Sequence, residues 1–425
     1  MSSAPQPAAE TAPTPAVPLA RNRAFRLLWI GQVLSDTGTE AALIAYPLLI
    51  LALTHSPTIA GLVGTVEMAV QLILGLPGGA ICDRLDRRLT MIVCDTGRGL
   101  VLALLAVLVL LHLVTWPVVL AVAVIDSGAN ALFNPSASAA LPGVVADEQL
   151  ERAWAATEAR TYTAGLVGPA LGGVLFGLGR SVPFVADAVS YLVSALSVSR
   201  IRGKFRAGRS GERKALWREV IDGLHLVWHQ PLLRAVIIQA PLINFAFNGV
   251  IFTITIALRQ HGTSPGVIGL AQAGVGLGGL LGAVIAPRLQ GRLSLWQLAT
   301  LVAAAGAALF GAAAVLLPST LVALPVAITL LLAPSANAAL FAAMLRAAPE
   351  DMRGRVSSTV VQASMSLAAL APLTSGLLVE HVSGQWSMAA FAAAMAVAAI
   401  MCVTLPGLRN AGSAALGANR RHRPE

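Results

Sequence analysis

Long apolar runs separated by short polar breaks dominate the pattern of residues along the chain. A helix needs about 20 mostly apolar residues to cross a bilayer, whereas the strands of a membrane barrel need about 10 and alternate in polarity. Because the runs have the longer length, we predict an all-α membrane protein with twelve transmembrane helices. The expected spans are 25–53, 57–81, 89–112, 117–138, 156–178, 182–201, 233–258, 264–287, 295–317, 319–345, 355–379 and 385–408.

Basic side chains gather on one side of this topology. Of the 29 Lys and Arg residues, 26 fall on one side, in turns, tails and the ends of spans; Arg180 and Arg259 fall on the other side, and Arg98 falls inside a span. Cytoplasmic loops of membrane proteins carry the excess of Lys and Arg. We therefore expect a multi-pass protein of the cell membrane with both termini cytoplasmic. Since the basic residues lie in turns, the net charge of +9 does not indicate nucleic-acid binding.

One long connection divides the spans into two sets of six. It is basic, and Leu216, Val220 and Leu224 have the spacing of an amphipathic helix that lies along the cytoplasmic interface. The expected divisions are 1–20, a disordered cytoplasmic tail rich in Pro and Ala; 21–201, an N-terminal six-helix bundle; 202–232, the cytoplasmic linker; 233–408, a C-terminal six-helix bundle; and 409–425, a basic cytoplasmic tail.

The two sets of six spans are related by an internal repeat. At an offset of 208 residues and, later in each half, of 203 residues, similar residues recur in one register. Two parallel six-helix repeats are typical of secondary transporters, which hold their site between the halves near the membrane midplane. The matches include Ser56-Pro57 with Ser264-Pro265, Gly61 with Gly269, Asn134 with Asn337, Pro169 with Pro372 and Gly173 with Gly376.

The turn after the second span puts five charges into residues 83–88. A carboxylate at a cytoplasmic helix end can accept hydrogen bonds from a facing helix N-terminus, and neighbouring arginines can pair with it. Such a cluster forms only when the cytoplasmic ends are closed together, so we predict a conformational latch; the alternative is a basic anchor alone. The latch candidates are Gly79, Asp83, Arg84, Asp86, Arg87 and Arg88.

Acidic residues inside the spans are the candidates for chemistry. Asp36 and Glu40 are four residues apart and share a helix face, and the repeat aligns them with Asn244 and Asn248. We expect the two pairs to face each other across a central substrate cavity. Glu67 and Asp126 also lie near mid-span.

A buried carboxyl group suits reversible protonation because desolvation disfavours its charged form. Asp36, Glu40, Glu67 and Asp126 are therefore candidate proton carriers; the alternative for each is a structural hydrogen bond between helices. Asp95 and Arg98 are expected to pair with each other, being three residues apart on one span. Asp187 and Glu380 lie toward external ends, where solvation is expected.

Small residues in the fifth and eighth spans have spacings that allow close helix packing. Gly168 and Gly172 are four residues apart, as are Gly274 and Gly278, and Pro169 favours a kink. We expect a close, bendable contact between these two spans across the halves, with ordinary membrane packing as the alternative. The hinge candidates are Gly168, Pro169, Gly172 and Gly173.

These features together resemble the major facilitator superfamily, over residues 22–408. Gly79, Asp83, Arg84, Arg87 and Arg88 match its first-loop signature Gly-x-x-x-Asp-Arg-x-x-Arg-Arg, with Asp86 where a glycine is common. The segment Gly168-Pro169-x-x-Gly172-Gly173 is similar to the antiporter signature, although Ala164 replaces a glycine upstream. Within the superfamily the chain resembles the macrolide-efflux and siderophore-exporter branch of drug:proton antiporters. It lacks the fourth-span arginine of other drug antiporters and carries Asp126 in that span.

The resemblance implies a monomeric exporter of a small amphiphilic organic compound, such as a drug, an antibiotic or a siderophore-like molecule. Proton antiport with alternating access would drive it, with protons and the lipid bilayer as its other partners. An importer or uniporter of the same fold is the alternative; a membrane-embedded enzyme or a transport-dead sensor is disfavoured. The seven His are scattered, and we find no metal-ligand spacing and no G-x-x-x-x-G-K loop, so neither an enzyme activity nor a metal or other cofactor is expected.

Overall fold

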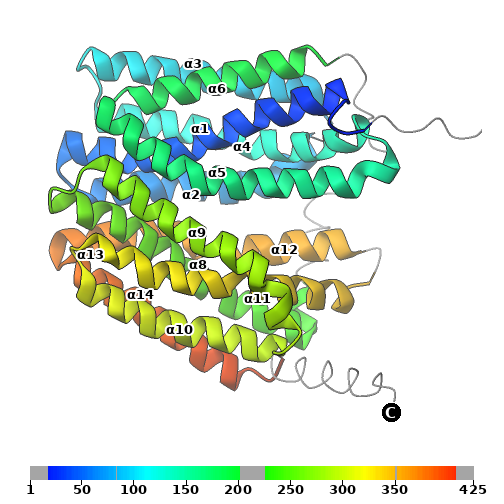
Figure 1. Ribbon diagram of the computed structural model, residues 1–425, viewed down its shortest axis with the longest axis vertical. Coiled ribbons are helices and arrows are strands. Elements are labelled where there is room, and N and C mark those ends of the chain that lie inside the picture. Colours follow the sequence, from blue (N-terminus) through cyan, green and yellow to red (C-terminus); the bar gives the residue numbers. More distant parts are fainter. Residues whose placement is uncertain (1–17, 83, 202–224, 350–351, 408–425) are drawn as a thin grey trace, which may run out of the picture.

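A computed structural model describes residues 18–82, 84–201, 225–349 and 352–407 (Figure 1). Within these residues twelve helical segments are long and apolar enough to cross a membrane, which confirms the predicted all-α membrane fold. The expected tails, most of the linker with its amphipathic helix, and Asp83 lie outside the described residues. The helices are α1 (Arg23–Thr54), α2 (Pro57–Cys82), α3 (Arg87–Leu110), α4 (Trp116–Ala140), α5 (Leu150–Leu178), α6 (Val182–Ser199), α8 (Pro231–Gln260), α9 (Pro265–Gln290), α10 (Leu295–Leu316), α11 (Ala323–Ala347), α12 (Arg353–Met365), α13 (Ala371–His381) and α14 (Gly384–Thr404).

The helix starts follow the internal repeat. The offset of 208 residues separates the first residues of α1, α2 and α3 from those of α8, α9 and α10. The offset of 203 residues separates the start of α5 from the start of α12. Residues paired by these offsets therefore occupy equivalent places in the two halves, so each half can be compared with the other position by position.

The eleventh span is broken, where the sequence pattern predicts one continuous helix. Helix α12 ends at Met365, a 3₁₀ turn covers Ala368–Leu370, and α13 begins at Ala371. Pro372 explains the break, because proline lacks an N–H and its ring clashes with the carbonyl four residues earlier. Its repeat partner Pro169 lies inside the unbroken α5, so the same residue type is accommodated in the first half.

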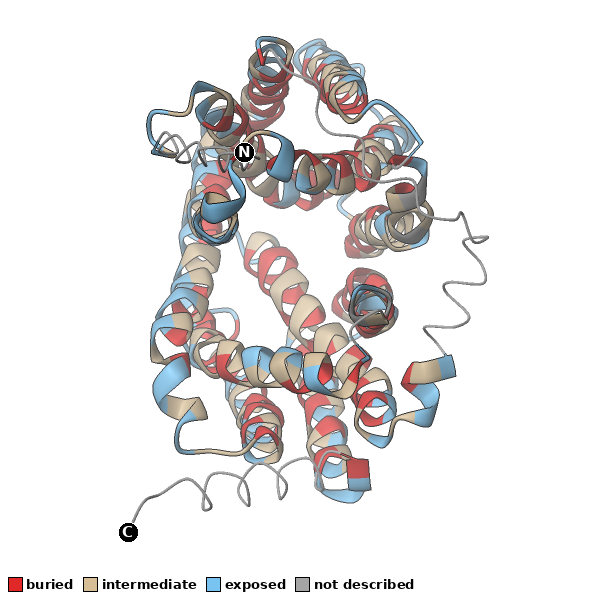
Figure 2. Cartoon of the chain, turned by 90° about the vertical axis from the view of Figure 1, so that its right-hand side faces the viewer, coloured by how far each residue is buried: buried red, intermediate tan, exposed pale blue. Residues whose placement is uncertain are grey.

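The helices form two groups, α1–α6 and α8–α14. The first group lies above the second in Figure 1, and the two surround a central region in Figure 2. The main contacts between the groups are α5 with α9 and α2 with α13. One buried apolar cluster contains residues of both groups, such as Ile50 of α1 and Phe391 of α14. Two further clusters, around Phe133 and around Met344, each belong to one group. The groups therefore share a core at one end of the molecule and have separate cores at the other.

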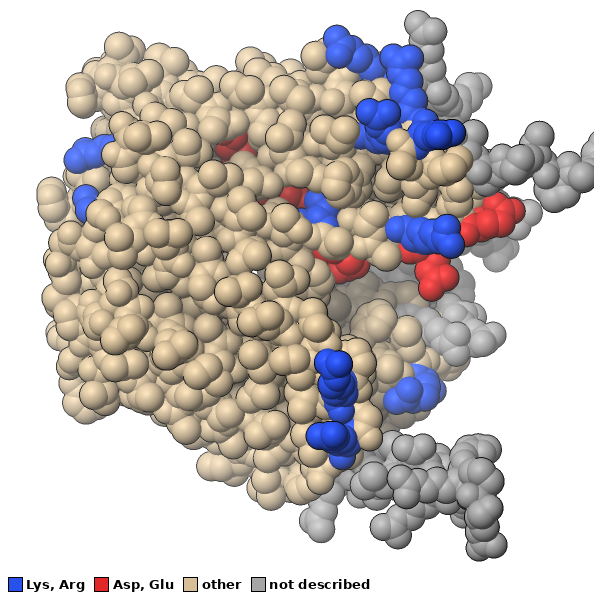
Figure 3. Space-filling view, viewed as in Figure 1, with Lys and Arg blue, Asp and Glu red and all other residues tan. Residues whose placement is uncertain are grey.

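Arginines mark the end at which the groups are separate, which we call the basic end. Arg23 begins α1 there, and Arg288 and Arg346 lie in the last turns of α9 and α11. Figure 3 shows Lys and Arg gathered at this end and the surface hollowed between the two groups. At the opposite end lie Arg180, after α5, and Arg259, in the last turn of α8.

Candidate functional site

A cavity of about 320 Å³ lies between the two groups of helices. Its walls come from α1 and α5 on one side and from α8, α9 and α11 on the other. Glu40 is its only charged wall residue within the described part of the chain, and Asn248, Thr255 and Gln272 are its other main polar residues. The structure therefore brings together Glu40 and Asn248, one member of each of the pairs that the repeat aligns. We call this space the central cavity.

The other two members of those pairs each link two helices of their own half. The Asp36 carboxylate lies 2.9 Å from Nε of Arg160 on α5, in an ion pair. The Asn244 side-chain amide donates to the carbonyl of Ser364 on α12, at 3.2 Å, and to the carbonyl of Ala240, at 3.0 Å. Asp36 and Asn244 are repeat partners, and so are α5 and α12. Each half thus ties its first helix to its fifth at the same place.

Sequence reasoning missed the role of Arg160, which counts there only as one of the basic residues of one side. Arg160 lies inside α5, as it does inside the predicted span 156–178, and only 10% of its side chain is exposed. It donates a hydrogen bond from Nη1 to Oε1 of Gln32 in addition to pairing with Asp36. A signal was present, because an arginine inside a predicted membrane span is costly unless it pairs with an acid or faces a cavity.

Arg98 is the centre of a buried polar network in the first half. Its Nε lies 2.7 Å from the Asp126 carboxylate of α4, and it donates from Nη1 to Asn130, at 3.2 Å. It also donates to the hydroxyl of Tyr191 on α6 and lies over that ring, 4.0 Å from its centroid. The Tyr191 hydroxyl is in turn 2.7 Å from the Thr39 hydroxyl of α1. Four helices are joined by this network.

The expected pairing of Arg98 with Asp95 is wrong. Arg98 reaches across to α4 and α6, where its planar, five-donor fork finds a carboxylate, an amide oxygen and a hydroxyl together. A neighbour three residues away on the same helix offers a single partner. Both carboxylate oxygens of Asp95 are buried. The candidate proton carrier Asp126 therefore has an arginine partner.

The remaining acids differ in their exposure. Glu67 on α2 is buried, with 7% of its surface exposed. Asp187 on α6 is fully buried, contrary to the expectation that solvent surrounds it, and accepts a hydrogen bond of 3.1 Å from Ser190. Glu380 is exposed, as expected, but its carboxylate binds the first residues of α2 from the other half.

Residues of the charged turn bind helix ends within the first half. The Asp86 carboxylate accepts the N–H of Leu89 at 2.9 Å and so caps α3. Arg87 donates to the carbonyl of Ala139 near the end of α4, at 3.0 Å. Arg88 donates to the carbonyl of Ser199, the last residue of α6. These arginines therefore lie beside helix C-termini, where the helix dipole favours positive charge.

The other latch candidates are Gly79, Asp83 and Arg84. Gly79 is near the end of α2, and a Cβ added there would meet no atom within 4 Å. Arg84 is exposed. Asp83, the carboxylate on which the latch depends, lies outside the described residues.

The hinge glycines face two different helices. A Cβ at Gly168 would collide with Glu40, and a Cβ at Gly172 would collide with the backbone of Ala41, so both glycines pack against α1 in their own half. Gly173, one residue and about 100° further around α5, faces α9 instead. The fifth and eighth spans are in contact, as expected, but they meet at Gly173 instead of at Gly168 or Gly172, and Gly278 of α9 packs against α11 of its own half.

Four glycines and four prolines bring helices of the two halves into close contact, away from the basic end. In each case a Cβ on the glycine would collide with the carbonyl oxygen of a proline on the facing helix. The repeat relates the two contacts of α2 and α13 to the two contacts of α9 and α5. The glycine–proline pairs are Gly61 with Pro372, Gly376 with Pro57, Gly269 with Pro169, and Gly173 with Pro265.

Comparison with known proteins agrees with this architecture. The chain is 26% identical over 399 residues to the multidrug efflux pump Tap of Mycolicibacterium fortuitum. The aligned region covers 90% of this chain and 96% of Tap. Among solved structures it is similar to a bacterial homologue of the human lysosomal transporter Spinster in an inward-facing, unoccupied conformation, with a TM-score of 0.68, 15% identity and coverage of 92% of this chain and 96% of that one.

A bacterial homologue of the iron transporter ferroportin in an inward-facing state has the same fold, with a TM-score of 0.70, 15% identity and coverage of 92% of this chain and 99% of that one. The model of the Major Facilitator Superfamily matches residues 28–371. The chain belongs to the Major Facilitator Superfamily and is a multi-pass membrane transporter rather than an enzyme.

Proposed function

We propose that this protein exports a small amphiphilic organic compound across the cell membrane by proton antiport with alternating access. In this proposal the basic end is cytoplasmic, because Lys and Arg accumulate in cytoplasmic loops, and both termini lie on that side. The similarity to a multidrug efflux pump supports export. The central cavity has walls from both halves of one chain, which supports a monomer as the transporting unit.

The central cavity is the observation that carries the proposal. It lies between the halves, which share a core at the opposite end and separate at the basic end. Such an arrangement gives a cytoplasmic molecule access to a carboxylate, Glu40, within a mostly apolar space. Amphiphilic ligands fit sites of this composition, in which a few polar groups fix orientation on apolar walls.

Among the four candidate acids, Glu40 is the best placed to couple a proton to the substrate. Asp36 and Asp126 are each paired with an arginine, and Glu67 is buried on α2. Glu40 alone lines the central cavity, where a proton and a charged substrate can exchange. In the transport cycle the bundles 21–201 and 233–408 would rock against each other, and the charged turn at residues 83–88 would latch the cytoplasmic ends when they close.

Proteoliposomes with an imposed pH gradient test this function. Purified protein is reconstituted, a panel of amphiphilic drugs is added, and proton movement is followed with a pH-sensitive dye inside the vesicles. We expect drug and proton to move in opposite directions, and Glu40→Gln to abolish the coupled proton flux. Glu151→Gln, at an exposed acid in the first turn of α5, is the matched control and should transport normally. Drug movement without proton movement in the wild type would identify a uniporter instead.

A further inference from the structure

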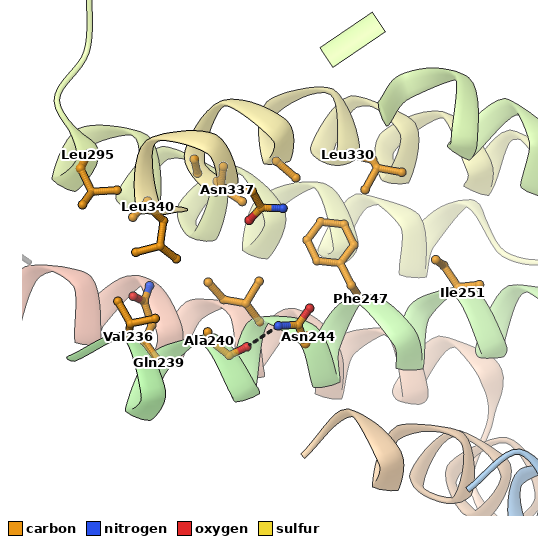
Figure 4. A pocket seen from close by; sticks show the side chains of 15 residues that line it. Val236, Gln239, Ala240, Asn244, Phe247, Ile251, Leu295, Leu330, Asn337 and Leu340 are labelled. Carbon is orange, nitrogen blue, oxygen red and sulfur yellow. Dashed lines mark hydrogen bonds between the residues drawn. The ribbon is translucent and has the colours of Figure 1, made fainter. Parts of the chain in front are cut away.

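A second pocket opens inside the C-terminal half, between α8, α10 and α11. It has a volume of about 220 Å³. In Figure 4, Phe247 and Asn337 project from facing helices into this space, and Leu295 lies at one end of it. Ile251 and Leu330 line both this pocket and the central cavity, so the two spaces adjoin. We call it the side pocket.

The internal repeat explains why the side pocket exists. Ala299 and Ala336 line it. Their repeat partners in the first half, at offsets of 208 and 203, are Met91 and Phe133. These two large side chains are 0% and 3% exposed and belong to one apolar cluster, so they fill the equivalent space. The pocket beside Phe133 in the first half has a volume of only about 50 Å³. Two small residues have therefore opened a space in one half that the other half closes.

The walls of the side pocket are uncharged. Apart from apolar side chains they present three amides, those of Gln239, Asn244 and Asn337. Gln239 is engaged with Cys402, and the Asn244 amide group donates to two carbonyls, which leaves its side-chain oxygen able to accept. An apolar ring system that carries one or two polar substituents suits these walls, whereas a charged group would be desolvated there without a partner.

The charge of the site lies in the adjoining central cavity, on the opposite half. Glu40 projects from α1, and the cavity wall around it, within the described residues, holds no other charged group. A carboxylate in such a space stabilises a cation. One molecule that occupies both spaces would therefore place a protonated amine beside Glu40 and an uncharged body between α8, α10 and α11.

We propose that the side pocket is the subsite for the uncharged ring body of a two-part substrate, an aromatic amine whose cationic end lies at Glu40. This inference rests on the proposed export function and adds the class of substrate to it. It assigns the two chemical parts of the substrate to the two halves of the protein. A molecule that bridges the halves contacts both of them, so its binding depends on how the halves are arranged.

Fluorescence titration of the purified full chain tests the proposal. The probe is quinacrine, an acridine ring with a cationic alkylamine chain, and acridine itself serves as the ring alone. We expect Ala336→Phe and Ala299→Met, which restore the residues of the first half, each to weaken the binding of both probes by about tenfold or more. Glu40→Gln should weaken quinacrine but leave acridine unchanged. Ala338→Phe, on the same helix at an exposed position outside both spaces, is the matched control and should bind as the wild type does.

A third variant of the side pocket distinguishes a loss of the subsite from misfolding, because it is expected to strengthen binding. Leu340→Ala enlarges the side pocket and should strengthen the binding of an acridine with an added ring relative to acridine itself. Melting curves of each variant show that it is folded. Quinacrine binding that responds to Glu40→Gln but to none of the pocket variants would overturn the subsite and leave the export function standing. Wild-type protein that binds neither probe while it transports other drugs would overturn the substrate class.

Discussion

The Glu380 carboxylate of α13 accepts a hydrogen bond of 2.6 Å from the Ser56 hydroxyl, just before α2 in the other half. It also accepts the N–H of Thr58, at 2.7 Å, and so caps the N-terminus of α2. The repeat partners of Ser56 and Glu380 are Ser264 and Gly177. The second half thus caps a helix of the first half. The first half has Gly177 at the position equivalent to Glu380, so it has no carboxylate there to cap α9.

Removal of this cap should favour opening of the end opposite to the basic end. Glu380→Ala removes both hydrogen bonds and a negative charge at a helix N-terminus, an interaction that stabilises exposed sites by about 0.3–1 kcal/mol. We expect the ratio of open to closed protein at that end to rise about two- to fivefold. The measurement is the labelling of Leu43→Cys, a half-exposed residue of the central cavity, by an impermeant maleimide added outside cells. The background lacks Cys82, Cys94 and Cys402.

Glu380→Gln separates the effect of charge from that of hydrogen bonding. In the wild type one carboxylate oxygen accepts both hydrogen bonds, and the amide oxygen of glutamine can also accept both but carries no charge. We expect labelling between that of the wild type and that of Glu380→Ala. Equal labelling in all three proteins would show that the cap does not hold this end closed.

The ion pair between Asp36 and Arg160 should contribute modestly to stability. Asp36 remains 29% exposed, so solvent screens the pair, and we expect Arg160→Ala to cost about 1 kcal/mol. Arg160→Lys keeps the charge and should recover part of this loss, although the hydrogen bond to Gln32 changes. Melting temperatures in detergent measure both. Identical melting of Arg160→Ala and the wild type would mean that other contacts hold α1 to α5.

The buried pair of Arg98 and Asp126 should contribute far more. Both side chains are less than a tenth exposed, and removal of one partner leaves an uncompensated buried charge, which costs about 3–5 kcal/mol. Arg98→Ala should therefore lower the melting temperature and the membrane abundance sharply. The double variant Arg98→Met with Asp126→Leu removes both charges and should recover much of the stability. A double variant no more stable than Arg98→Ala would contradict this account.

The pattern of apolar residues predicts the transmembrane helices, because a helix that crosses the bilayer must be about 20 residues long and mostly apolar, and both properties can be seen in the sequence. It did not identify which side chains meet. Arg98 was assigned to Asp95 because a helix neighbour is the only partner visible in sequence, whereas its partners Asp126 and Tyr191 lie on other helices. Which residue a buried side chain pairs with depends on how the helices are rotated about their axes. The spacing of apolar and polar residues in the sequence does not determine that rotation.

The repeat supplied part of what periodicity could not. It paired Glu40 with Asn248 through their equivalent positions, and the two residues line one cavity. The repeat also makes Met91 and Phe133 the equivalents of alanines in the other half, and that difference in size makes a pocket. Volume is a property of several residues at once, so it emerges only when the helices are packed.

The glycine contacts between the halves should control closure of the end opposite to the basic end. Gly173 lies so close to the carbonyl of Pro265 that no Cβ fits, whereas a Cβ at Gly177, one turn further along α5, would meet no atom within 4 Å. Gly173→Leu should therefore prevent α5 from closing against α9, at a cost of about 1–3 kcal/mol for overpacking, which corresponds to a shift of about 5- to 150-fold toward the open state. Labelling of Leu43→Cys from outside should rise accordingly, and Gly177→Leu should leave it unchanged.

Gly172→Leu, which collides with Ala41 inside one half, should lower the melting temperature instead. If Gly173→Leu and Gly177→Leu were labelled alike, the close approach of α5 and α9 would not be what keeps this end shut.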